Sequence, residues 1–65
     1  MENLNYLKNE QWVISFNSLR IQQLLENIQN GVVVGGVSNE VQLEDALSII
    51  ENSVKNIKEY LEISI

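Results

Sequence analysis

"LEDALSIIENSVKNIKEYL", residues 43–61, is the stretch that decides the fold. Its apolar residues recur in alternating steps of four and three, which is the spacing of a helix that packs along another helix. Ala46 and Tyr60 flank this stripe and widen it to the face that a globular bundle buries. The pattern predicts a helix from about residue 39 to about residue 62. Its predicted seam consists of Leu43, Leu47, Ile50, Val54, Ile57 and Leu61.

The start of this helix is also marked in the sequence. Ser38 or Asn39 is a suitable N-cap, and Gln42 follows Asn39 by three residues, as a capping box requires. Glu40 places negative charge near the positive end of the helix dipole, and Lys58 places positive charge toward the other end. These signals agree with a helix that begins near residue 39.

The first half of the chain contains a second helical pattern. In "NSLRIQQLLENIQNG", residues 17–31, one face is formed by Ile21, Leu24, Leu25 and Ile28. Gly31 is suited to the position just past the end of this helix, after Asn30, because glycine adopts a left-handed backbone at no steric cost.

The preceding stretch "QWVISF", residues 11–16, has two interpretations. With a period of two, Trp12, Ile14 and Phe16 alternate with smaller or polar residues, and the β propensity is high. Asn17 then caps a helix, and "GVVVG", residues 31–35, supplies the second strand. This alternative is a small α+β fold with strands near 11–16 and 31–35.

With the heptad spacing, the same stretch belongs to one long helix. The spacing runs without a break, with polar residues only at Gln11 and Ser18, which is tolerable in a seam. We favour this interpretation, a helix over about residues 4–30, because two isolated strands are only marginally stable. Its seam consists of Leu4, Leu7, Gln11, Ile14, Ser18, Ile21, Leu25 and Ile28.

The stretch between the helices, "GVVVGGVS", residues 31–38, is short enough to make them antiparallel. Gly31 stops the first helix, while Gly35 and Gly36 permit the backbone angles of a reversal. We expect the valines to form a hydrophobic plug over the open end of the core. These are Val32, Val33, Val34 and Val37.

The length of 65 residues predicts a single domain, residues 1–65, with a small core. There are no cysteines and no histidines, so neither disulfides nor the usual zinc sites are available to stabilise it. A partner chain is the remaining way to stabilise so small a core. We therefore predict an all-α, antiparallel helical hairpin that associates with itself into a four-helix bundle or a higher oligomer.

Charge narrows the classes of partner. Four Lys and Arg residues stand against nine Asp and Glu residues, and this net charge of −5 argues against nucleic acid as a partner. No apolar run approaches the roughly 20 residues that span a bilayer, and the beginning "MENLNYLKNE" does not have the pattern of a signal peptide. We expect a cytoplasmic protein with no membrane partner.

Catalysis and metal binding are not expected. Without histidine or cysteine, the commonest general base and the best thiol nucleophile are missing. Glu44 and Asp45 are adjacent and diverge on a helix, and Glu59 and Glu62 lack further ligands. The sequence predicts no catalytic residue, no metal site and no cofactor.

Trp12, Phe16 and Arg20, four residues apart, form a second ridge if this stretch is helical. Aromatic residues with an arginine are typical of interface hot spots. A single hairpin cannot bury both this ridge and the seams. The sequence therefore predicts a small non-enzymatic interaction protein. It would act as a helical homo-oligomer and serve as a regulator, an adaptor or an inhibitor of a larger protein. Its candidate contacts with a subunit or a target are this ridge and the seam of residues 43–61.

A second hypothesis is a small-molecule or nucleotide binder. Backbone amides freed by glycines, followed directly by a helix N-terminus, are able to hold an anion. The loop does not match the GxxxxGK[ST] or GxGxxG patterns. Its candidate ligand residues are Gly35, Gly36, Ser38 and Asn39.

Overall fold

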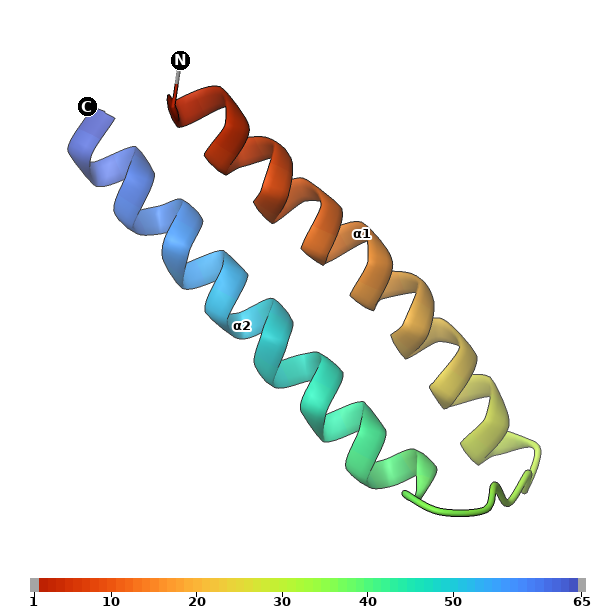
Figure 1. Cartoon of the computed structure of the whole chain (residues 1–65). Helices are drawn as coiled ribbons and strands as arrows, with labels where there is room; N and C mark the ends of the chain where they lie inside the picture. The colour runs from red at the N-terminus through yellow and green to blue at the C-terminus, as the bar shows by residue number, and fades with distance from the viewer. Residues whose placement is uncertain (1, 65) are drawn as a thin grey trace.

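The computed structural model describes the backbone of residues 2–64 and the side chains of residues 5–63. The described residues form two helices, α1 (Glu2–Gln29) and α2 (Asn39–Ser64), that lie side by side and antiparallel (Figure 1). The loop closes one end of the hairpin, and the start of α1 and the end of α2 lie at the other, in a rod of 46 × 18 × 17 Å. The predicted helical hairpin is confirmed.

The α+β alternative is wrong, because the described residues contain no strand and residues 11–16 lie within α1. Asn17, the cap in that alternative, is buried in the middle of the helix. The local β propensity is overridden because the helical spacing places Val13 and Ile14 half-buried beside α2.

The end of α1 follows the expected role of Gly31. The N–H of Val32 donates to the carbonyl of Asn27 at 2.9 Å, and that of Gly31 donates to Ile28 at 3.2 Å. Gly31 has a φ of 69°, so the pair of bonds forms a Schellman motif with glycine at its left-handed position.

Replacing Gly31 by alanine is expected to lower the free energy of unfolding by about 1 kcal/mol, because an L side chain is strained in the left-handed region. A Cβ at Gly31 meets no atom within 4 Å, so backbone strain alone acts. Urea denaturation followed by circular dichroism measures the change. Gly35→Ala is the matched control, since Gly35 is equally open and does not have a positive φ. Equal stability of the two variants would contradict the assignment.

The start of α2 uses one of the two expected caps. The N–H of Val41 donates to Oγ of Ser38 at 3.2 Å, which makes Ser38 the N-cap. The capping box of Asn39 and Gln42 does not form. Gln42 instead donates to the carbonyl of Val37 at 2.9 Å, and Asn39 donates to the carbonyl of Val32 at 2.7 Å.

The contact between the helices is centred on small and polar residues. The buried residues recur every seven positions, at Asn17 and Leu24 on α1 and at Asn39, Ala46 and Ser53 on α2. These positions lie one residue before Leu25 and Leu47 of the predicted seams. The prediction that the seams themselves form the centre of the contact is therefore wrong. On α2, small side chains such as Ala46 and Ser53 occupy the central positions, because they let the two backbones approach closely while larger residues pack at the edges.

The predicted seam residues lie along the edge of this contact. On α2, Leu43, Ile50 and Ile57 are half-buried, whereas Leu47, Val54 and Leu61 are 44%, 41% and 48% exposed. On α1, the half-buried residues are Leu7, Ile14, Ser18, Ile21 and Ile28, and Gln11 and Leu25 are exposed. The side chain of Leu4 lies outside the described residues.

The prediction of a valine plug is wrong. All residues of the loop, 31–38, are exposed, and Val33 is 92% exposed. The buried side chain of Asn39 already holds the loop end of the hairpin through its bond to the Val32 carbonyl. The valines consequently lie outside the core.

Candidate interaction surfaces

The aromatic ridge, Trp12 and Phe16, lies in the open on α1. The two rings stack with their centroids 5.5 Å apart and an angle of 7° between their planes. Trp12 is 66% exposed and Phe16 is 54% exposed, with Leu19 also exposed beside them. The ridge therefore does not complete the core of its own hairpin, and it presents a preformed apolar surface.

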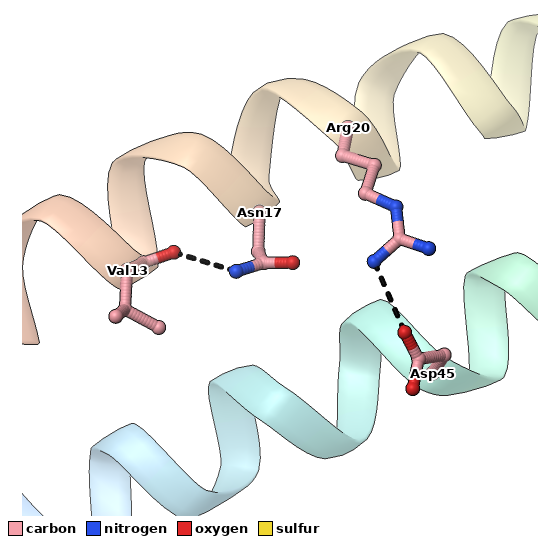
Figure 2. A network of polar contacts seen from close by, with 4 residues as sticks. All are labelled: Val13, Asn17, Arg20 and Asp45. Carbon is pink, nitrogen blue, oxygen red and sulfur yellow. Dashed lines mark hydrogen bonds and ion pairs between the residues drawn. The ribbon is translucent and has the colours of Figure 1, made fainter.

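Arg20, the third residue predicted for the ridge, is engaged within the chain. Its Nη1 lies 3.2 Å from Oδ2 of Asp45 and links α1 to α2 (Figure 2). Asp45 is largely exposed, so this ion pair contributes at most about 1 kcal/mol. Arg20 thus contacts α2, whereas Trp12 and Phe16 stack on each other along α1.

A groove between the helices runs from the aromatic ridge toward the loop. It has a volume of about 450 Å³ and extends from Phe16 and Leu19 to Asn39 and Gln42. Near the open end of the hairpin, Asn56 donates to Glu10 at 3.1 Å. The groove and the Arg20–Asp45 pair therefore lie on the side of the hairpin that carries Phe16 of the aromatic ridge.

The opposite side carries the predicted seams. Successive helical residues turn by about 100°, so Asp45 and Leu47 lie on opposite sides of Ala46. The same geometry separates Phe16 and Gln23, which line the groove with Arg20, from Leu25. The Arg20–Asp45 pair lies on one side of both helices. The residues that directly follow the buried Leu24 and Ala46, which are Leu25 and Leu47, therefore lie together on the other side. We define the seam face as the following apolar residues of this side: Ile14, Ile21, Leu25, Ile28, Leu43, Leu47, Ile50, Val54, Ile57 and Leu61.

The open end of the hairpin holds two tyrosines. The rings of Tyr6 and Tyr60 stack with centroids 6.2 Å apart. Partial burial raises the pKa of Tyr6, and the nearby negative charges of Glu10 and Glu59 raise it further. The stacked rings join the ends of the two helices.

Three of the four candidate ligand residues of the loop, Gly36, Ser38 and Asn39, border a hollow of about 220 Å³, and Gly35 does not. Gly35, Gly36 and Ser38 are exposed, and Ser38 already accepts the hydrogen bond of the Val41 amide. Asn39 is buried, and its Oδ1 has no hydrogen-bond partner. That atom accepts hydrogen bonds, and Glu40, an acidic residue, also borders the hollow. An anion would meet repulsion there, so the geometry does not favour the nucleotide hypothesis.

No other site chemistry emerges from the described residues. Among the side chains that the structure describes, those of residues 5–63, no three acidic residues come close enough together to hold a metal ion. In the same part of the chain, neither helix combines the length and apolar character needed to cross a membrane.

Two features of these surfaces were not predicted from the sequence: the buried amides of Asn17 and Asn39, and the pairing of Arg20 with Asp45. A signal for the first exists, because Asn39, Ala46 and Ser53 recur every seven residues as a small or polar series. Comparison with protein-family models, with curated proteins and with solved structures finds no match to this chain.

Proposed function

We propose that this protein is a non-enzymatic interaction module that acts as a helical homo-oligomer and serves as a regulator, an adaptor or an inhibitor of a larger protein. One observation carries the proposal. Among the described residues, only Leu24 and Ala46 are buried apolar side chains, whereas large apolar residues are exposed along both helices. Such a hairpin gains little stability from its own core, and exposed apolar surface of this kind is typical of interaction sites.

The first test is the mass in solution. Light scattering coupled to gel filtration, at micromolar concentration, is expected to give at least twice the chain mass of 7.4 kDa. Association is expected because it covers the apolar side chains that the hairpin leaves exposed. A folded, helical species of 7.4 kDa would contradict the oligomeric part of the proposal.

The second test concerns the aromatic ridge as the contact with a target. Trp12→Ala is expected to abolish capture of the target while leaving helicity and oligomer mass unchanged, because the Trp12 ring lies largely outside the hairpin. Pull-down from lysate, compared with the wild type and with the exposed control Ser15→Ala, measures the loss. Arg20→Glu is measured as a separate variant, because it also sets a carboxylate against Asp45 of the other helix. Unchanged capture by the Trp12 variant would exclude this ridge as the contact.

A further inference from the structure

The seam face is the exposed surface for which the described residues best indicate a binding partner. We propose that a second copy of this chain covers the seam face, so that two hairpins form a four-helix bundle and the aromatic ridge remains outside it. This inference rests on the proposed function, since it requires a homo-oligomer, and it adds the number of copies and the surface they use.

The exposed area of the hairpin agrees with one missing partner. Its accessible surface is 5144 Å². A compact monomer of 7.4 kDa exposes about 4200 Å² by the usual scaling of surface with mass. The excess, roughly 900 Å², is close to the roughly 800 Å² that each partner buries in a standard protein–protein interface.

The arrangement of the apolar residues agrees with another helical hairpin as the occupant. Leu47, Val54 and Leu61 recur every seven residues, so they form a straight stripe about 21 Å long at 1.5 Å per residue. Leu25 of α1 is exposed on the same side. A hollow of about 550 Å³ borders Ile50 and Val54, and its remaining lining is charged: Glu51, Lys55, Lys58, Glu59 and Glu62. Repeats of this kind pack as knobs into the holes of another helix.

Charge separates the two sides of the hairpin. Each copy carries a net charge of −5, so two copies associate best where charged groups are absent. The apolar strip of the seam face is uncharged, and charged residues of both signs border it on α2: Glu40, Glu51, Lys55, Lys58, Glu59 and Glu62. The side of the aromatic ridge instead carries the Arg20–Asp45 pair. Self-association through the seam face therefore avoids burying this pair.

The test uses paired substitutions on opposite sides of α2. Leu47→Asp with Val54→Asp places two charges on the seam face, while Val41→Asp with Ser48→Asp places two charges, also seven residues apart, on the exposed remainder of the helix. We expect the wild type and the second variant to weigh about 15 kDa, twice the chain mass. The first variant is expected to dissociate, with the dimer Kd raised at least about 100-fold by the unpaired charges.

A second measurement covers the case in which the first variant unfolds. The chain has no cysteines, so Val54→Cys and Ser48→Cys introduce single thiols at matched positions. Under mild oxidation, Val54→Cys is expected to form a disulfide-linked dimer faster than Ser48→Cys. Equal rates, dissociation by the Val41/Ser48 pair alone, or three or more copies would overturn the inference while the homo-oligomer stands. A monomeric wild type would overturn both proposals.

Discussion

Replacing Ala46 by leucine is expected to lower the free energy of unfolding by about 2 kcal/mol, in the range found for overpacked cores. Ala46 is fully buried, at 0% exposure, in the middle of the contact between α1 and α2. The next central positions on α2 hold Asn39 and Ser53, which are also small and buried. Three added carbon atoms have no space there, so the helices must separate locally and lose contact along their length.

Urea denaturation followed by circular dichroism, at one fixed protein concentration, measures this effect. Ser48→Leu is the matched control, because Ser48 lies on the exposed face of the same helix. The control is expected to shift the free energy of unfolding by less than about 0.5 kcal/mol. Equal stability of the Ala46 variant and the wild type would show that the helices are not closely packed at this position.

Replacing Asn17 by leucine is expected to have the opposite effect and to raise the free energy of unfolding by about 1–2 kcal/mol. The Asn17 side chain is buried, and its Nδ2 donates to the carbonyl of Val13 at 2.9 Å (Figure 2). Its Oδ1 is buried without a hydrogen-bond partner. Leucine has nearly the same shape and removes this unsatisfied acceptor, and the Val13 carbonyl keeps its place in the hydrogen-bond pattern of α1.

Two further variants sharpen this prediction. Asn17→Asp is expected to destabilise the fold at neutral pH, because it places an unpaired negative charge in the same buried position. Asn52→Leu makes the identical chemical change at an exposed position of α2 and is expected to be nearly neutral. Chemical denaturation measures all three. A loss of stability with Asn17→Leu would mean that the amide oxygen has a favourable partner.

The sequence determined those features that depend on neighbouring residues along the chain. The helical period extends through residues 11–16, and it overrides the β propensity of Trp12 and Phe16 because burial follows the period of the whole helix. Gly31 ends α1 through bonds that reach back only a few residues. The stacking of Trp12 on Phe16 likewise follows from a separation of four residues on one helix.

The tertiary structure decided how each helix is rotated about its own axis. The apolar stripe of α2 is wide, so both Ala46 and Leu47 suit the centre of the contact when α2 is considered alone. The choice depends on both helices at once, because Asn17 and Leu24 of α1 are buried together with Ala46 and Ser53 of α2, while Leu47 and Val54 stay at the edge. The pairing of Arg20 with Asp45 follows from that rotation and from the alignment of the two helices, which no local pattern in either helix specifies.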